Sequence, residues 1–203
     1  MPAQPTREKR KRKKGKKVAI LVAHEFEDIE VLYPLLRLSE EGAGIILATL
    51  HTGFHPRPAF PEKPVTGRFG TVIPPIVLRE GKRFTHLTID RLNVDEIDCV
   101  IIPGGFAPDR LRIDQTTLNI VKGAYNRGKV VAAICHGPQV LISAGIIKGK
   151  KATGYTAVKD DLVNAGARFL DVPVIRDGNI ITSRVPDDLP QFCQEIIKAL
   201  EES

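Results

Sequence analysis

The chain of 203 residues lacks the features that mark membrane, secreted and disulfide-rich proteins. It has no run of about 18 apolar residues, so we expect no membrane-spanning helix. Its first residues are charged and contain no apolar segment, which argues against a secretory signal peptide. Three cysteines are too few and odd in number for a disulfide framework, so a reducing, cytoplasmic compartment is expected.

Patterns that hold metals or dinucleotides are also missing. His51, His55 and His86 have no acidic or thiol partners at the spacing of metal ligands, so we expect no metal. The pair Gly104 and Gly105 is not part of a G-x-G-x-x-G run, so no dinucleotide site is expected. The sequence therefore predicts a protein without a cofactor.

The excess of positive charge is confined to the start of the chain. Residues 1–17 contain nine Lys or Arg and one Glu, a net charge of +8, whereas the other residues contain 21 bases and 23 acids, a net charge of −2. A block of like charges with few apolar residues is expected to stay disordered. It is either a solubilising extension or a segment that weakly binds nucleic acid, another polyanionic surface or a targeting receptor. No aromatic residues interleave with the charges, so base stacking is not indicated.

Strands and helices are expected to alternate along the remainder, residues 18–203, which we interpret as one domain. Continuous apolar runs predict buried strands at residues 18–23, 45–50, 98–102, 130–134 and 180–183. Helical spacing predicts helices at residues 27–41, 113–127, 138–144, 157–165 and 189–200. Prolines and glycines punctuate residues 51–92, which we interpret as hairpins and loops. The pattern predicts a doubly wound α/β fold, with a mostly parallel sheet flanked by helices.

The most informative position is Cys135. It lies where the apolar run 130–134 stops and a helical pattern begins at Pro138. A strand, sharp turn and helix in this order form a nucleophile elbow, which exposes a reactive atom above the end of a sheet. A helix amino terminus stabilises negative charge, so the thiol is expected to lose its proton more easily. A buried structural cysteine is the alternative, and the adjacent His136 favours chemistry.

Three predicted strand ends converge on this place. The first is followed by residues 24–28, another by Gly104 and Gly105, and the third by Cys135 and His136. They supply a nucleophile, a base and backbone N–H groups, the parts that acyl transfer needs.

At these residues the chain resembles the PfpI family of intracellular cysteine peptidases, in the ThiJ/PfpI superfamily with the class I glutamine amidotransferase-like fold. The resemblance extends over residues 17–201 and is carried by ordered motifs at residues 25–30, 33–34, 103–108, 132–145, 159–166 and 183–189. Residues 55–63 and 76–84 look like insertions relative to compact members of the family.

The resemblance implies a role for each matching position. Cys135 is implied as the nucleophile, His136 as its base, and Glu27 as a protonated carboxyl that touches the sulfur. The N–H groups of Gly105 and His136 are implied as the oxyanion hole. The position implied to reach a histidine of a neighbouring subunit is Asp109, where the family has a longer Glu. A homo-oligomer and a small carbonyl or peptide substrate are also implied.

Several functions stay open. The first is a cysteine-dependent hydrolase acting on peptides or amides through Cys135, His136 and Asp109. The second, also implied by the resemblance, is glyoxalase III-like or deglycase-like chemistry on 2-oxoaldehydes, which would use Cys135 and Glu27. The third is a stress protein without turnover, in which an exposed cysteine is oxidised.

Overall fold

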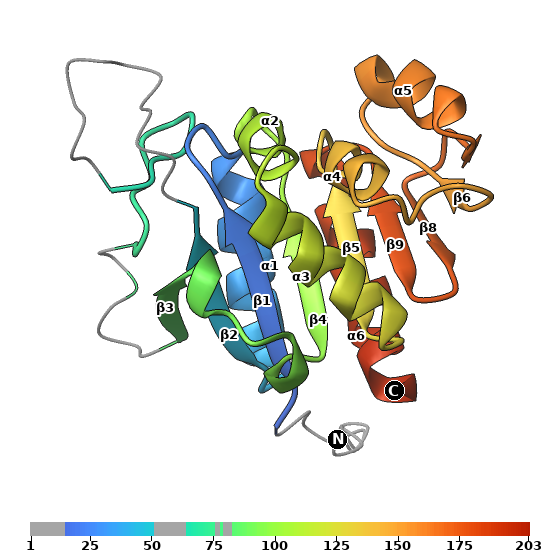
Figure 1. Ribbon diagram of the computed structural model, residues 1–203. Coiled ribbons are helices and arrows are strands. Elements are labelled where there is room, and N and C mark those ends of the chain that lie inside the picture. The colour runs from blue at the N-terminus through green and yellow to red at the C-terminus, as the bar shows by residue number, and fades with distance from the viewer. Residues whose placement is uncertain (1–14, 51–63, 76–77, 79–82) are drawn as a thin grey trace, which may run out of the picture.

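The computed structural model describes residues 15–50, 64–75, 78 and 83–203 (Figure 1). Residues 1–14 of the basic segment, the whole of the expected insertion 55–63 and most of the expected insertion 76–84 lie outside the described residues. No helix among the described residues is long and apolar enough to cross a membrane.

A seven-stranded sheet forms the centre of the molecule, as the alternating pattern predicts. Neighbouring strands are parallel except for the last pair in the order, which is antiparallel. Across the sheet the strands are β3 (Phe84–Thr88), β2 (Gly44–Thr49), β1 (Lys17–Val22), β4 (Cys99–Ile102), β5 (Val130–Ile134), β9 (Ile180–Ser183) and β8 (Val174–Asp177).

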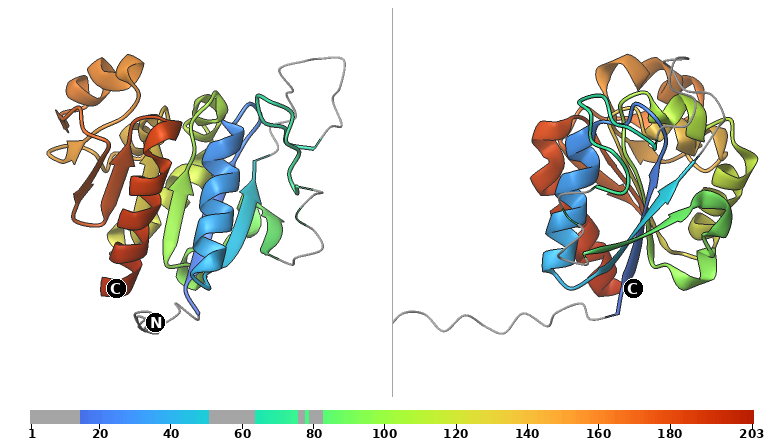
Figure 2. Two further views of the ribbon diagram at one scale, coloured as in Figure 1. Left: turned by 180° about the vertical axis from the view of Figure 1, so that it is seen from behind. Right: turned by 90° about the vertical axis from the view of Figure 1, so that its left-hand side faces the viewer.

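Helices lie on both faces of this sheet. The helices are α1 (Asp28–Glu40), α2 (Ala107–Leu111), α3 (Gln115–Asn126), α4 (Pro138–Ser143), α5 (Lys159–Asn164) and α6 (Leu189–Glu202). Helices α1 and α6 pack side by side on one face, and α3 covers the other (Figures 1 and 2). Shorter 3-10 turns occupy Ile89–Arg91, Val94–Glu96, Thr156–Val158 and Pro186–Asp188.

The central strands explain why their sequences are continuously apolar. Strands β4 and β5 are buried along their whole length, and β1 is buried from its second residue onward. Because helices cover both faces of the sheet, neither set of alternating side chains meets water. Predicted and observed bounds of these strands agree within about one residue, since a buried parallel strand gives the strongest sequence signal.

The two edge strands, β3 and β8, lie where the sequence predicts no strand. Strand β3 lies within residues 51–92, which were predicted to form only hairpins and loops, and it pairs with β2 along five residues. The prediction was wrong there because an edge strand has one neighbour and keeps polar side chains, here Thr85, His86 and Thr88. Strand β8 and the two-residue strands β6 (Lys151–Ala152) and β7 (Arg168–Phe169) are also too short or too polar for an apolar run.

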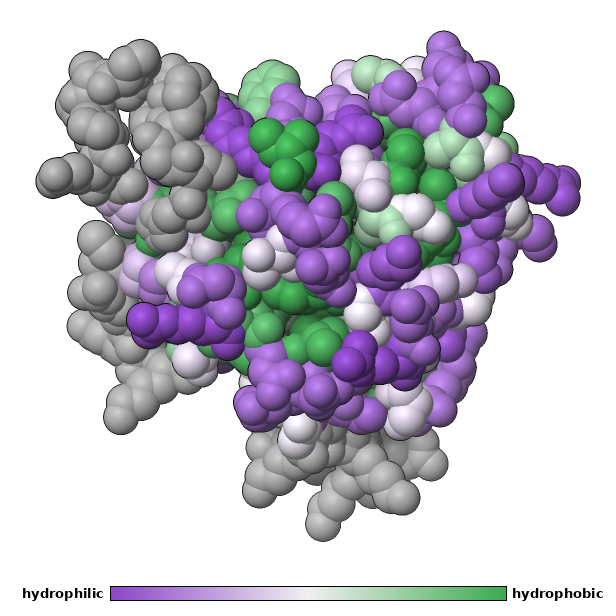
Figure 3. Space-filling model, viewed as in Figure 1, coloured by the Kyte–Doolittle hydropathy of each residue, from purple (hydrophilic) through white to green (hydrophobic). Residues whose placement is uncertain are grey.

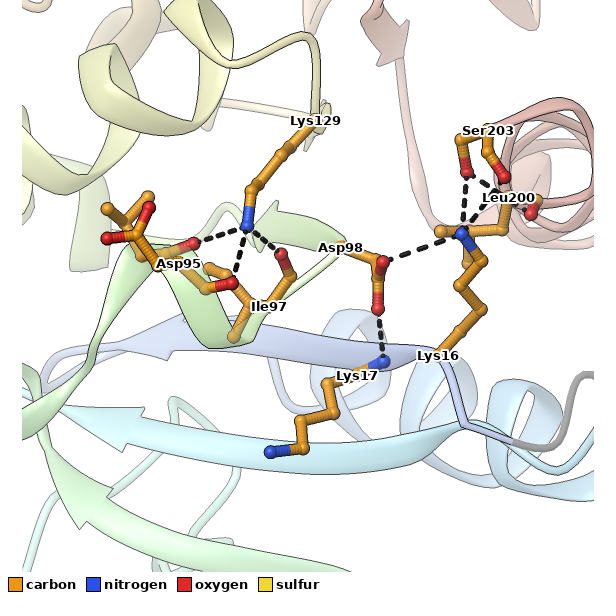
Figure 4. Close-up of polar contacts among 9 residues, drawn as sticks. Lys16, Lys17, Asp95, Ile97, Asp98, Lys129, Leu200 and Ser203 are labelled. Carbon is orange, nitrogen blue, oxygen red and sulfur yellow. Dashed lines mark hydrogen bonds and ion pairs between the residues drawn. The ribbon is translucent and has the colours of Figure 1, made fainter.

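Lysines and backbone acceptors gather at the amino ends of the central strands (Figure 4). The Lys129 ammonium, just before β5, donates to the carbonyl oxygens of Val94, Asp95 and Ile97 at 2.7, 3.0 and 2.5 Å. Asp98, just before β4, accepts from the backbone N–H of Lys17 at 2.8 Å and faces the Lys16 ammonium at 3.4 Å. These contacts fasten the starts of β1, β4 and β5 to one another.

Apolar and polar side chains are interspersed on the face of the molecule that α3 covers (Figure 3). Large apolar side chains that are exposed include Phe69, Phe106 and Ile113. Two of these, Phe69 and Phe106, belong to the segments beside the carboxyl ends of the strands.

Candidate active site

The backbone at Cys135 has the strained turn that the sequence predicts. Strand β5 ends at Ile134, α4 begins at Pro138, and Cys135 between them has a φ of 61°, in the left-handed region. A residue other than glycine rarely adopts this conformation, and such strain clusters at functional sites. The turn is fixed from outside, because the N–H of Cys135 donates to the Ser183 carbonyl at 3.1 Å and its own carbonyl accepts from Tyr155 at 2.9 Å.

The segment after β4 approaches the sulfur from the neighbouring strand. A side chain at Gly104 would place its Cβ 2.6 Å from the Cβ of Cys135 and 3.0 Å from the sulfur, so only glycine fits. The bridge between Phe26 and Gly105 then joins this segment to the loop that follows β1. The three strand ends expected to converge therefore meet at one place.

The carboxyl beside the sulfur belongs to Glu30. Its Oε2 accepts the N–H of Gly104 at 2.6 Å, and the side chain is fully buried in the first turn of α1. Burial raises the pKa of Glu30 to about 7, and the hydrogen bond from Gly104 opposes the rise. Its Oε1 is buried without a hydrogen-bond partner among the described residues. Burial with one oxygen unpartnered favours the neutral carboxylic acid over the carboxylate.

Glu27, which the resemblance placed against the sulfur, is held elsewhere. It precedes α1 as the N-cap residue, and its Oε2 accepts from Nη1 of Arg68 at 2.9 Å. The two glutamates are three residues apart and share one side of the helix, so the motif alone does not separate them. Of the two glutamates only Glu30 is fully buried, beside Val31 and Pro34, and the sequence holds no signal that distinguishes it from Glu27.

The surroundings of the sulfur raise the pKa of the Cys135 thiol, whereas its place at a helix terminus predicts a lowered pKa. Burial raises the pKa of the Cys135 thiol to about 12, and the charge of Glu30 acts in the same direction. The backbone N–H groups of Gly105 and His136 donate to the sulfur and act against the rise. The prediction of a lowered thiol pKa is therefore wrong, because the rise caused by burial is larger than any lowering by the helix terminus. A thiolate forms here when a base takes the proton and Glu30 is neutral.

His136 lies within reach of that proton. Its Nδ1 is 3.3 Å from the Cys135 sulfur, and its ring faces the ring of Tyr155 with centroids 5.1 Å apart. Burial lowers the pKa of His136, while the charge of Asp109 acts to raise it. A neutral imidazole at neutral pH is the form that can accept a proton. Asp109, at the start of α2, thus acts on the His136 of its own chain; the expected reach to His136 of the partner subunit stays a prediction.

The remaining candidates are structural. Cys99 and Cys193 are free and fully buried in the core, as expected from their apolar surroundings. His24 is buried, and its Nδ1 accepts from the backbone N–H of Thr66 at 3.2 Å. His51 and His55 lie outside the described residues, and within the part of the chain that the structure describes no group of three potential ligands could hold a metal ion.

Residues 16–199 match the model of the DJ-1/PfpI family. The chain belongs to the DJ-1/PfpI family. It is 40% identical over 185 residues to "Deglycase PfpI" of Pyrococcus furiosus, covering 91% of this chain and 99% of that protein. It is 37% identical over 187 residues to "Protein/nucleic acid deglycase 2" of Escherichia coli, covering 92% and 98%.

A solved structure supports the same assignment. A two-domain protein from Anabaena variabilis, with DJ-1/ThiJ/PfpI-like and ferritin-like domains, matches with a TM-score of 0.77 and 36% identity. The match covers 92% of this chain and 50% of that one. This agreement extends from the sequence to the arrangement of strands and helices, so the DJ-1/PfpI fold predicted from the motifs is confirmed.

Proposed function

We propose that this DJ-1/PfpI protein is a cysteine-dependent deglycase, which removes adducts of 2-oxoaldehydes from amines by hydrolysis. The observation that carries the proposal is the surroundings of Cys135: a base at 3.3 Å, a buried carboxyl and two backbone N–H groups at one sulfur. Two relatives that match nearly the whole chain are named deglycases. Each named part has a task in adding a thiol to a carbonyl.

The chemistry begins with transfer of the thiol proton to Nδ1 of His136. The sulfur then displaces the amine from the carbon of the adduct that was the aldehyde carbon, and the proton held by His136 leaves with the amine. The hydrogen on that carbon moves as a proton to the neighbouring carbonyl carbon through an enediolate, so the sulfur is left in a thioester that water hydrolyses. An oxygen of the substrate carries negative charge in the shift and again in the hydrolysis. The N–H groups of Gly105 and His136, which already point at the sulfur, are the donors nearest to that oxygen. Glu30 in its neutral form adds no second negative charge beside the thiolate and can donate its proton to that oxygen, after which the negative charge lies on the Glu30 carboxylate. Overall, adduct and water give the free amine and a 2-hydroxy acid.

A peptidase is the second candidate, and the charge of Asp109, which acts to raise the pKa of His136, favours it. Cysteine, histidine and a carboxylate form the usual set for acyl transfer, and the charge of Asp109 acts on the imidazole within one chain. In this reaction His136 would return its proton to the leaving amine of a peptide. Asp109→Asn is then expected to lower peptide hydrolysis while leaving deglycation intact.

Release of lysine from its methylglyoxal adduct, measured beside methylglyoxal consumption, tests the proposal. Wild type should turn over many times and Cys135→Ala should lose the activity. Cys99→Ala is the matched control, because it removes a thiol that is fully buried in the core. Equal activity of Cys135→Ala and wild type would refute a cysteine mechanism. Substoichiometric reaction with every substrate and peroxide-sensitive Cys135 would instead support a redox-sensing stress protein.

A further inference from the structure

A hairpin over residues 64–75 stands beside the site and is held by helix α1. Thr66 and Val72 form its bridge. Its turn is fixed by Asp28, whose two carboxylate oxygens accept the N–H groups of Phe69 at 2.9 Å and Thr71 at 2.8 Å. Any side chain at Gly67 would collide with that carboxylate, 2.5–2.7 Å from its Cβ. The helix that carries Glu30 therefore also sets the position of the hairpin.

The same hairpin extends the backbone ladder that contains the oxyanion donors. The N–H of Glu25 donates to the carbonyl of Thr66 at 2.8 Å, and the N–H of Arg68 donates to the carbonyl of Phe26 at 3.0 Å. Phe26 in turn bridges Gly105. The backbone of Arg68 is thus joined through one residue to the N–H group that donates to the Cys135 sulfur.

The Arg68 guanidinium is oriented by its neighbours and keeps N–H groups that can bind a ligand. Nη1 donates to Glu27 at 2.9 Å, and the structure shows no other hydrogen bond from this side chain to the described residues. Its central carbon lies 5.3 Å from the centroid of the Phe106 ring and 5.7 Å from that of Phe69. The side chain is 41% exposed, so a ligand can reach its remaining N–H groups. Two rings and one carboxylate therefore surround the cation.

The charge of Arg68 affects the pKa values of two groups at the site. Burial dominates the pKa of both Glu30 and His136, and the positive charge of Arg68 acts to lower both. A substrate whose carbonyl oxygen meets the N–H of Gly105 would carry its substituents past the next residue, Phe106, and so toward the guanidinium. Arginine binds carboxylates through two parallel N–H bonds, which gives both attraction and orientation.

We propose that Arg68 is a specificity residue that selects reactants carrying a carboxylate within a few atoms of the carbon that Cys135 attacks. The inference deepens the proposed function, because it names the substrate class: adducts of acidic 2-oxoaldehydes are preferred to adducts of neutral ones. Glu27 is the positioning residue that aims the guanidinium, which gives it a task away from the sulfur.

Alkylation of Cys135 tests this without any turnover. The sulfur displaces iodide from iodoacetate or from iodoacetamide, forming a thioether in both cases, and only iodoacetate carries a carboxylate. Arg68→Gln should lower the ratio of the two rate constants about tenfold, and Arg68→Lys should restore part of it. Arg127→Gln is the matched control, an arginine paired with Asp95 at 2.7 Å near the amino ends of the strands. An unchanged ratio in Arg68→Gln, or an equal fall in Arg127→Gln, would overturn the inference.

Turnover then separates this inference from the proposed function. The probes are the lysine adduct of 4,5-dioxopentanoate, a 2-oxoaldehyde with a carboxylate, and the lysine adduct of its methyl ester. We expect wild type to prefer the acid and Arg68→Gln to lose that preference through KM more than through kcat. If both probes are consumed equally by both proteins, the function stands and the inference fails. If neither is consumed, the proposed function fails, and the alkylation ratio still decides the role of Arg68.

Discussion

The amino ends and the carboxyl ends of the central strands differ in how fully their polar groups are paired. At the amino ends, the Lys129 ammonium is surrounded by three carbonyl oxygens, and Asp98 meets both Lys16 and the N–H of Lys17. At the carboxyl ends, Cys135 is in a left-handed conformation and Glu30 is buried with one oxygen unpartnered among the described residues. The first end satisfies its polar groups, and the second leaves them poised for reaction.

This contrast shows where stability and chemistry can be changed separately. Strain and buried carboxyls persist only where the surroundings hold them, and here the rigid strands β4 and β5 provide that support. Substitutions at the amino ends should therefore change the free energy of unfolding with little effect on catalysis. Substitutions at the carboxyl ends should change catalysis first.

The largest effect on kcat is expected when the glutamates at the start of α1 are replaced by glutamine one at a time. Glu30→Gln should lower kcat by about 10²–10⁴, the usual contribution of a positioned acid or base. Glu27→Gln should change kcat only a few-fold, because Glu27 pairs with Arg68 instead. Steady-state rates of the two isosteric variants with one neutral 2-oxoaldehyde adduct measure the difference. A larger loss in Glu27→Gln would restore the assignment made from the resemblance.

The pH dependence of stability should carry the signature of Glu30. Its pKa is raised from 4.5 to about 7, so the folded chain binds more protons than the unfolded chain between these values. The stabilisation is full below pH 4.5 and is lost as pH rises to about 7, a change of roughly 3 kcal/mol in unfolding free energy. Urea denaturation of wild type and Glu30→Gln across this range should show a steeper fall in wild type. Parallel profiles would contradict the raised pKa.

A smaller effect is expected at the opposite end of the strands. Lys129→Met keeps the length of the side chain but removes the ammonium from its three carbonyl acceptors. The free energy of unfolding should fall by about 2 kcal/mol, the scale of hydrogen bonds to a charged group. Activity per folded molecule should stay unchanged. A loss of activity at unchanged stability would show that the two ends are coupled.

The smallest effect on the folded part should come from deleting residues 1–14. This segment carries most of the +8 charge of residues 1–17 and precedes β1. We expect the melting temperature to change little, and weak polyanion binding, with its steep salt dependence, to disappear. Heparin binding at several salt concentrations measures it. Binding that ignores salt, or survives the deletion, would exclude an electrostatic role for the segment.

The sequence predicts the buried central strands well and the exposed edge strands poorly. The apolar runs of β1, β4 and β5 have one interpretation, and they led directly to the elbow at Cys135. Strand β3 has a mixed pattern because only β2 pairs with it among the described residues, so its sequence resembles a loop.

At the site, the sequence does not distinguish two carboxyls that lie within one helix turn of each other. Glu27 and Glu30 are both in the motif, and only packing shows that Glu30 faces the sulfur while Glu27 turns to Arg68. The hairpin that carries Arg68 is far from both in the sequence, and no local pattern links it to Cys135. The thiol pKa was misjudged because the degree of burial is a property of the whole fold.

Titration of Glu30 by infrared difference spectroscopy decides whether a neutral acid lies beside Cys135. The spectrum of wild type minus Glu30→Gln isolates the carbonyl stretch of this one carboxyl. We expect a protonated acid that persists well above the ordinary pKa of 4.5 and disappears around pH 7. A carboxylate already formed near pH 5 would contradict the neutral acid beside Cys135, and with it the proposed use of Glu30 as a proton donor.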